Sequence, residues 1–138
     1  CGQVDKNVDK YVDYLLKDEK NNQSRVVDMG ITGAKRAELE YRVLKRRKSE
    51  LYGELTLAEI SLITGRHHQI RVQMAAHGFP LWGDRKYNPA FSEAKKGTEN
   101  IALSAYRLAF FHPATGKAMD FCRRPKEGIF NIADSDQN

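Results

Sequence analysis

The sequence predicts an α+β fold in which a mixed, mainly antiparallel sheet packs against one central helix. Two observations indicate the sheet. Apolar and charged residues alternate over residues 37–43, as in a strand with one buried face, and a run rich in leucine and isoleucine follows over residues 51–63. The third observation is one short stretch, residues 66–78, in which apolar side chains recur at helical spacing.

The N-terminal part of the chain is predicted to add two strands. Residues 8–17 fit either a strand or one to two turns of helix, because periodicity does not separate the two, and we favour a strand. Residues 18–24 are polar and contain Asn21-Asn22, which is typical of a turn. A short strand over residues 25–28 then ends before a loop with two glycines.

A hairpin is predicted to form the centre of the sheet. Residues 37–43 and 51–63 are its two strands, and a basic run over residues 45–48 lies between them. We interpret this run as a solvent-exposed turn at the tip of the hairpin and not as a dedicated phosphate-binding patch.

One helix is predicted to begin after Gly65 and to end at Gly78. Residues three or four apart lie on the same side of a helix, so the spacing defines two faces. One face carries Ile70, Met74 and His77, and the other carries His67, Arg71 and Ala75. We expect the first face to dock on the sheet and Arg71 to point elsewhere.

The C-terminal part is predicted to contain a long loop and a second hairpin. The loop covers residues 79–97 and includes one helical turn at residues 92–95. Alternation returns over residues 101–111, and residues 117–123 pair back after a turn that contains Gly116.

Composition limits the class of protein. The chain has 138 residues, which suits one globular domain, predicted to cover residues 1–126 before a polar C-terminal tail over residues 127–138. Lysine and arginine outnumber aspartate and glutamate by 23 to 18, and the net charge of +5 favours an anionic partner. No run approaches the roughly 18 apolar residues of a membrane helix, and the first residues show no charged-then-apolar pattern, so we expect neither a membrane span nor an intact secretory signal in these residues. Cys1 and Cys122 lie far apart, which indicates reduced thiols in a soluble, cytoplasmic protein.

Two arginines stand at the start of the predicted helix. Arg66 lies just before it and Arg71 inside it, so both guanidinium groups are suited to bind a phosphate near the free N–H groups of the first turn. The alternative is that they form ordinary ion pairs, Arg66 with Glu59 and Arg71 with Asp84. The residues alone leave both interpretations open.

The histidines and aromatic residues of this region invite further hypotheses. His67 and His68 are adjacent and His77 is nine residues beyond His68, a spacing that disfavours a metal site. Aromatic rings interleaved with basic residues can stack on a nucleobase, but more often they close a core. We expect the core for Phe79 and leave Trp82 open. The sequence contains no P-loop, Rossmann, serine-hydrolase or H-E-x-x-H motif.

Four blocks of the sequence resemble the C-terminal half of RNA pseudouridine synthases of the RluA class. They are Thr64–Val72, Gly78–Tyr87, Leu103–Leu108 and His112–Gly116. The resemblance implies that residues 1–126 are the C-terminal part of a pseudouridine synthase catalytic domain. It also implies an enzyme that isomerises uridine to pseudouridine in structured ribosomal or transfer RNA, without a cofactor or a metal.

The resemblance assigns roles to individual residues. In this family an aspartate attacks the uridine, and the second arginine of the T-G-R-x-H-Q-I-R block pairs with that aspartate; here this arginine is Arg71. Leu103 is expected to line the pocket. The residues expected to contact RNA are Arg66, His67, His68, Gln69, Arg85 and Lys86.

The sequence departs from the family in one decisive respect. The R-L-D-x-x-T-S-G motif that carries the catalytic aspartate is absent, and Asp84 belongs to a structural Gly-Asp turn. We therefore expect a fragment that begins after the nucleophile and is inactive alone; the alternative is a non-catalytic RNA-binding module or degenerate paralogue. The sheet is expected to expose an edge that self-associates or pairs with the missing half. Three further positions carry a residue that is not the usual one in the family: His67, Gln73 and Ser104.

Overall fold

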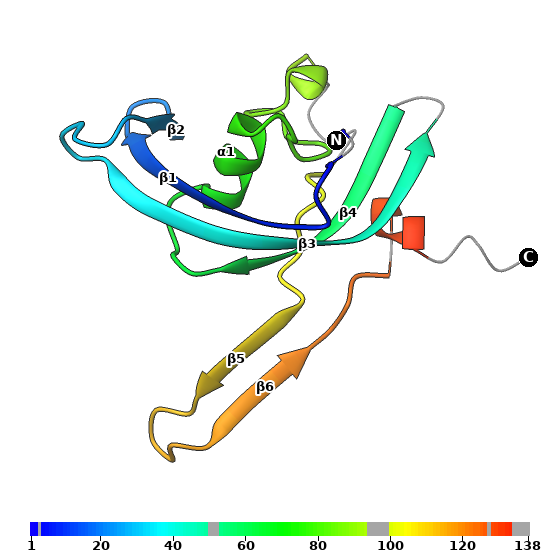
Figure 1. Ribbon diagram of the computed structural model, residues 1–138. Helices are drawn as coiled ribbons and strands as arrows, with labels where there is room; N and C mark the ends of the chain where they lie inside the picture. The colour runs from blue at the N-terminus through cyan, green and yellow to red at the C-terminus, as the bar shows by residue number, and fades with distance from the viewer. Residues whose placement is uncertain (3, 50–52, 94–99, 127, 134–138) are drawn as a thin grey trace, which may run out of the picture. The chain divides into compact units, whose positions relative to one another are not determined.

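The computed structural model describes residues 1–2, 4–49, 53–93, 100–126 and 128–133 (Figure 1). The chain divides into two compact units, Cys1–Ile101 and Ala102–Asn138, which are considered one at a time. Within the described residues no helix has both the length and the apolar character needed to cross a membrane.

A four-stranded antiparallel sheet forms the first unit. Its strands are β1 (Val8–Asp18), β2 (Gln23–Val27), β3 (Lys35–Ser49) and β4 (Gly53–Leu62), in the order β2-β1-β3-β4. Residues 8–17 are thus a strand and not a helix. Together with one helix, this sheet confirms the predicted α+β class.

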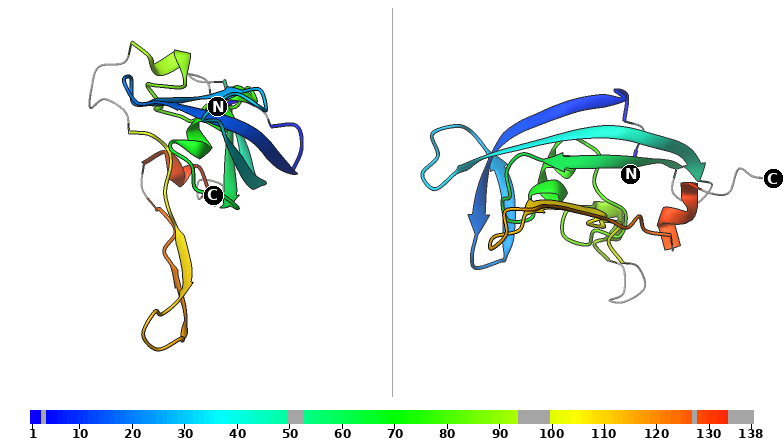
Figure 2. Two further views of the ribbon diagram at one scale, coloured as in Figure 1. Left: turned by 90° about the vertical axis from the view of Figure 1, so that its left-hand side faces the viewer. Right: turned by 90° about the horizontal axis from the view of Figure 1, so that it is seen from below.

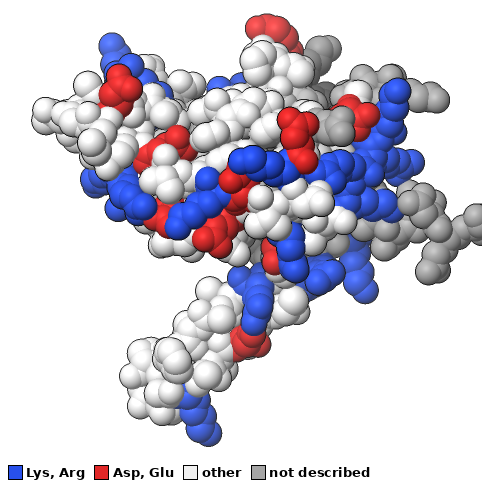
Figure 3. Space-filling view, viewed as in Figure 1, with Lys and Arg blue, Asp and Glu red and all other residues white. Residues whose placement is uncertain are grey.

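The basic run of residues 45–48 continues β3, so the prediction of a turn there is wrong. Lys45 pairs with Leu57 and Lys48 with Glu54, after a register shift next to Val43. A charged residue can stand in the strand while the backbone completes the ladder: the Arg46 guanidinium, for example, donates from Nε and Nη2 to the Val4 carbonyl at 3.2 and 2.7 Å. Figure 3 shows basic side chains gathered over this end of the sheet.

The helix α1 (Gln69–Ala76) packs on one face of the curved sheet, as Figures 1 and 2 show. Met74 lies in a buried cluster with Tyr11, Leu39 and Tyr41, and Ile70 packs against that cluster. The predicted docking face is therefore confirmed. Burying such apolar side chains stabilises the fold by about 1.5–3 kcal/mol each.

The segment after α1 covers the remaining core. Phe79 packs against the Met74 cluster, which confirms its predicted core role, and Trp82 is buried with its ring centroid 4.9 Å from that of Phe91. A 3-10 turn, η1 (Pro89–Phe91), lies three residues before the predicted helical turn. It begins there because the Asn88 side chain accepts the Ala90 N–H. Residues 94 and 95 of the predicted turn lie outside the described part of the chain.

The second unit contains an antiparallel hairpin of β5 (Arg107–Phe111) and β6 (Ala118–Cys122), followed by a 3-10 helix η2 (Gly128–Ala133). The predicted hairpin is confirmed, but its first strand begins at Arg107 and not at residue 101. The ladder with β6 starts at the pair Arg107 and Cys122, so alternation over residues 101–106 did not mark a strand there. The 3-10 helix lies inside the segment predicted as a tail.

Leu39 provides a direct test of the core. It is fully buried, so Leu39→Ala is expected to lower the free energy of unfolding by about 2–5 kcal/mol, through lost apolar burial and the cavity left behind. Leu44, on the same strand, is 47% exposed, and Leu44→Ala should cost less than about 1 kcal/mol. Urea unfolding of both variants measures the difference, and equal losses would contradict the described burial.

Candidate functional site

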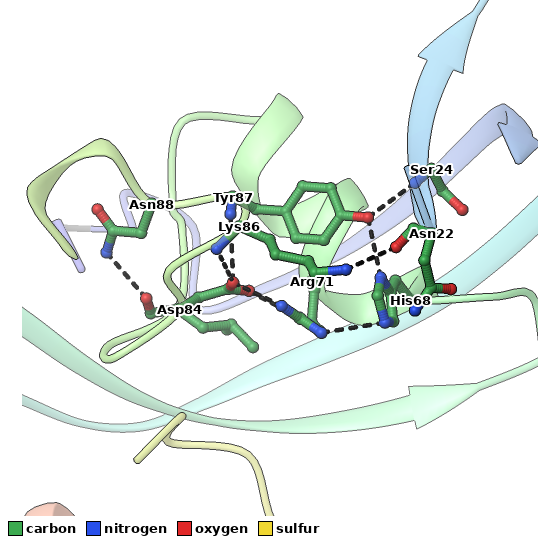
Figure 4. Close-up of polar contacts among 9 residues, drawn as sticks. Asn22, Ser24, His68, Arg71, Asp84, Lys86, Tyr87 and Asn88 are labelled. Atoms are coloured by element: carbon green, nitrogen blue, oxygen red, sulfur yellow. Dashed lines mark hydrogen bonds and ion pairs between the residues drawn. The ribbon is translucent and has the colours of Figure 1, made fainter. Parts of the chain in front are cut away.

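Arg71 stands at the centre of the candidate site, where α1 meets the loop after Trp82 (Figure 4). Its guanidinium donates two hydrogen bonds to Asp84, from Nε to Oδ2 at 2.9 Å and from Nη2 to Oδ1 at 2.8 Å. The Asp84 side chain is fully buried and that of Arg71 is 20% exposed. Of the two interpretations that the sequence left open for Arg71, its ion pair with Asp84 is therefore formed.

Asp84 is held by more than this ion pair. Its Oδ1 also accepts the backbone N–H groups of Lys86 at 3.0 Å and Tyr87 at 3.2 Å. Burial would raise the pKa of Asp84, but the hydrogen bonds and charge of Arg71 and these two amides outweigh it and hold the pKa below its ordinary value. The carboxylate is therefore ionised near neutral pH.

Glycine is required just before this aspartate. Gly83 has a φ of +69°, and an added Cβ would lie 2.3 Å from the carbonyl oxygen of Asn100. Only glycine fits this left-handed backbone and close approach without strain. The Gly83-Asp84 turn thus aims the carboxylate at α1.

His68 contacts the other side of the guanidinium. It precedes α1 with a left-handed backbone, φ 52°, and its Nε2 lies 3.1 Å from Nη1 of Arg71. Burial, followed by the positive charges of Arg71, His67 and Lys86, lowers the pKa of His68 to about 4. The imidazole is neutral at pH 7.

Tyr87 contacts both neighbours. Its ring centroid is 5.1 Å from Cζ of Arg71, and its hydroxyl lies 3.0 Å from Nδ1 of His68. The same hydroxyl accepts the backbone N–H of Ser24 on β2 at 2.8 Å. Ser24 and this role of Tyr87 were not predicted, because the contact joins residues 63 positions apart and no local pattern marks it.

Gln69, predicted to contact RNA, is 3% exposed and bonded internally. Its Oε1 accepts the Arg66 N–H and the Thr64 hydroxyl, both at 2.9 Å, and its Nε2 donates to the carbonyl of Glu38 at 3.0 Å. The side chain therefore joins the start of α1 to β3.

The other side chains predicted to contact RNA differ in their exposure and in the hydrogen bonds that they already make. Arg66 is exposed and its Nε donates to the carbonyl of Arg36 at 3.0 Å, whereas Glu59 pairs with Arg42 at 3.1 Å. Arg85 is also exposed. The Lys86 Nζ donates to the Asn22 carbonyl at 2.8 Å, and Nδ1 of His67 lies 2.9 Å from the Ser24 hydroxyl.

Two departures from the family lie in different settings. Gln73 is fully buried and donates to Asp13 at 2.7 Å, while its Oε1 has no partner among the described residues. It belongs to the interior of the first unit. Ser104 is exposed in the second unit, as is Leu103, the predicted pocket residue, at 40%.

Of the three histidines of this region, His67 and His68 contact residues of the candidate site, whereas His77 lies elsewhere. His77 stacks on Tyr11 with ring centroids 3.7 Å apart and bonds Asp13 at 3.1 Å. In the described part of the chain no three His, Cys, Asp or Glu side chains are grouped to hold a metal ion.

The arrangement leaves Arg71 with capacity for one further acceptor. A guanidinium carries five N–H groups, and the contacts with Asp84 and His68 use three of them. The two others, one on each Nη, have no hydrogen-bond partner among the residues the structure describes. A carboxylate or phosphate is the acceptor that such a group binds best.

Comparison with known proteins identifies the family of this chain. The family described as RNA pseudouridylate synthase matches residues 1–76, more than half of the chain, and the chain belongs to this family. The human RNA pseudouridylate synthase domain containing 1 has the same fold, with a TM-score of 0.73 at 18% identity over 91% of this chain and 51% of that chain.

The names of similar proteins support the resemblance to RluA-class synthases. An RNA pseudouridine synthase of Bacillus subtilis, YlyB, is 41% identical over 76% of this chain, and ribosomal large subunit pseudouridine synthase C of Escherichia coli is 33% identical over 93%. The dual-specificity synthase RluA of Vibrio parahaemolyticus is 36% identical over 70%. The chain spans only 31%, 40% and 40% of the lengths of these three relatives.

The Arg71–Asp84 pair predicts a pH-dependent contribution to stability. Because the folded-state pKa of Asp84 is lowered, its contribution is present above the ordinary aspartate pKa, about 3.9, and is lost as pH falls through the folded value. Asp84→Asn should lower the free energy of unfolding by roughly 2–4 kcal/mol at pH 7. The difference from the unmodified chain should narrow below about pH 4.

Urea unfolding between pH 7 and pH 3 measures this difference. Asp120 serves as the matched control, since it also accepts two hydrogen bonds from an arginine, Arg107, but on the exposed hairpin. Asp120→Asn should change stability little. If the loss in free energy of unfolding caused by Asp84→Asn stays constant down to pH 3, the ionised pair is ruled out as its cause.

Proposed function

We propose that this chain is the C-terminal part of an RNA pseudouridine synthase, acting on uridine in ribosomal or transfer RNA, and that it contributes Arg71 to the active site. The observation that carries the proposal is the Arg71 guanidinium, fixed by Asp84 and His68 with two N–H groups unused among the described residues. The names of the relatives support RNA as the substrate class, and synthase C in particular favours ribosomal RNA.

The proposed reaction needs a second carboxylate. In the route through the sugar, an aspartate oxygen bonds to C1′ as the bond between N1 and C1′ breaks. The uracil turns, and C5 bonds to C1′ as the bond between C1′ and the aspartate breaks. The C5 proton is then lost and N1 gains a proton. Asp84 is unsuited to this role because it is fully buried and its two oxygens already accept four N–H groups. The R-L-D-x-x-T-S-G motif is absent, so these 138 residues alone are proposed to have no turnover.

RNA contacts in this proposal come from side chains at the surface near the helix start. Arg66 and Arg85 are exposed and suited to phosphates, with Lys86 and His67 beside them. Both ring nitrogens of His68 are already bonded to Arg71 and Tyr87, so His68 is proposed to act through Arg71. Such contacts offset the cost of extruding the target uridine from its stack, a few kcal/mol.

Two separate candidate partner surfaces are proposed, one in each unit: the sheet edge in the first unit and the apolar hairpin in the second. In the described sheet β4 is an edge strand, and its Glu54 carbonyl accepts the Gly2 N–H at 2.8 Å. Large apolar side chains on the hairpin are exposed: Leu108, Phe110, Phe111 and Phe121. Pairing with the remainder of a synthase domain, or self-association, would cover such surfaces.

Tritium release tests the proposal. Uridine labelled at C5 loses its tritium to water on isomerisation, so a large-subunit ribosomal RNA transcript carrying this label reports turnover. The 138-residue chain should release no more tritium than its Arg71→Ala variant. A longer chain from the same gene that adds an R-L-D-x-x-T-S-G segment should be active, and Arg71→Ala should lower its rate by about 10²–10³-fold.

Arg66→Ala is the matched control in the longer chain. It removes an exposed arginine five positions away, so it should weaken RNA binding and lower the salt dependence of affinity while leaving most of the maximal rate. Turnover by the 138-residue chain above its Arg71→Ala variant would refute the missing-nucleophile proposal. RNA affinity that does not fall with added salt would argue against the phosphate contacts.

A further inference from the structure

The contact between Arg71 and His68 fixes which ring nitrogen carries the proton. Nη1 of Arg71 lies 3.1 Å from Nε2 of His68, and a guanidinium can only donate. Nε2 must therefore present its lone pair. In a neutral imidazole the proton then resides on Nδ1.

The Nδ1 proton has an acceptor in the right place. The Tyr87 hydroxyl oxygen is 3.0 Å from Nδ1 and also accepts the Ser24 N–H at 2.8 Å. The oxygen thus receives two N–H groups, one from β2 and one from the imidazole. Hydrogen bonds with a consistent direction run from Arg71 to His68 and from His68 to Tyr87.

We propose that Tyr87, anchored on the Ser24 N–H of β2, positions Arg71 by holding His68 as a neutral acceptor with its proton on Nδ1. The geometry of this proposal needs no RNA, but its meaning for catalysis rests on the function proposed above. Tyr87 is a positioning residue, because it touches the guanidinium with its ring and orients it through the imidazole.

A change of tautomer or the protonation of the His68 imidazole would break this arrangement. A proton on Nε2, in the other tautomer or in the imidazolium, would place two donors 3.1 Å apart. The titratable or charged groups whose charge acts on the ring are Arg71, His67, Lys86 and Asp84, and a positive charge on any of the first three disfavours the imidazolium. Arg71 would keep Asp84 on one edge but lose the second contact that fixes the direction of Nη1.

The anchor extends to the tip of the β1–β2 hairpin. Lys86, next to Tyr87, donates to the Asn22 carbonyl at 2.8 Å, and the Ser24 hydroxyl donates to the His67 carbonyl at 3.0 Å. The loop with Asp84 and the residues before α1 are therefore both tied to β2. Through these contacts β2 helps to hold both segments that surround Arg71.

Tyr87→Phe tests the proposal, because it keeps the ring against Arg71 and removes only the hydroxyl. In ¹⁵N spectra of the 138-residue chain at pH 7, His68 is expected as the Nδ1–H tautomer, with separate resonances for the two Nη groups of Arg71. Tyr87→Phe should populate the Nε2–H tautomer, and the Arg71 Nη resonances should merge as rotation about the Cζ–Nη bonds becomes faster.

Tyr14→Phe is the matched control, since Tyr14 is a partly buried tyrosine of β1 outside this chain of contacts. It should leave both signatures unchanged, and a melting curve for each variant verifies that it is folded. An Nε2–H or protonated His68 in the unmodified chain would overturn the proposal, and so would Tyr87→Phe spectra identical to those of Tyr14→Phe. Because no RNA is present, neither result depends on the proposed catalytic activity.

Discussion

The site depends on one buried carboxylate. A charge without water is costly to bury unless several donors compensate it, and Asp84 receives four N–H groups while its side chain is fully buried. Two of these donors belong to Arg71 on α1, and two are amides of its own loop. The carboxylate therefore ties the loop to the helix, and Gly83 is the residue that lets the loop turn tightly enough to bring it there.

The polar side chains of the T-G-R-x-H-Q-I-R block divide into two groups. Gln69 bonds β3 and the backbone of the turn before it, and His68 bonds Arg71 and Tyr87, so these serve the geometry. Arg66 keeps its side chain at the surface, and Arg71 keeps two N–H groups unused by the described residues. Most hydrogen bonds made by the polar side chains of this block are therefore internal, and they hold in place the few groups that face outward.

Elements with a local signature could be predicted from the sequence, whereas contacts between distant elements could not. Alternation located β3, a run rich in leucine and isoleucine located β4, and helical spacing located α1 and its docking residue Met74. The basic run at residues 45–48 was mistaken for a turn because charge records solvent exposure and not backbone pairing. Pairing of Arg71 with Asp84 remained one of two interpretations, and the bonds from Tyr87 to Ser24 and His68 were unforeseen, because each depends on the packing of α1 and its loop against the sheet.

A neutral acceptor at position 68 suits an arginine that has a second anion to bind. Asp84 already balances the charge of Arg71, so a carboxylate in place of His68 would leave the cluster with excess negative charge and repel another anion. An imidazole without charge fixes the Nη1 group and adds nothing to that balance. Lys86 lies close enough for its charge to lower the pKa of His68, so the surroundings of Arg71 retain a positive contribution. An incoming carboxylate or phosphate would therefore meet a rigid guanidinium with two N–H groups available in an environment that still favours an anion.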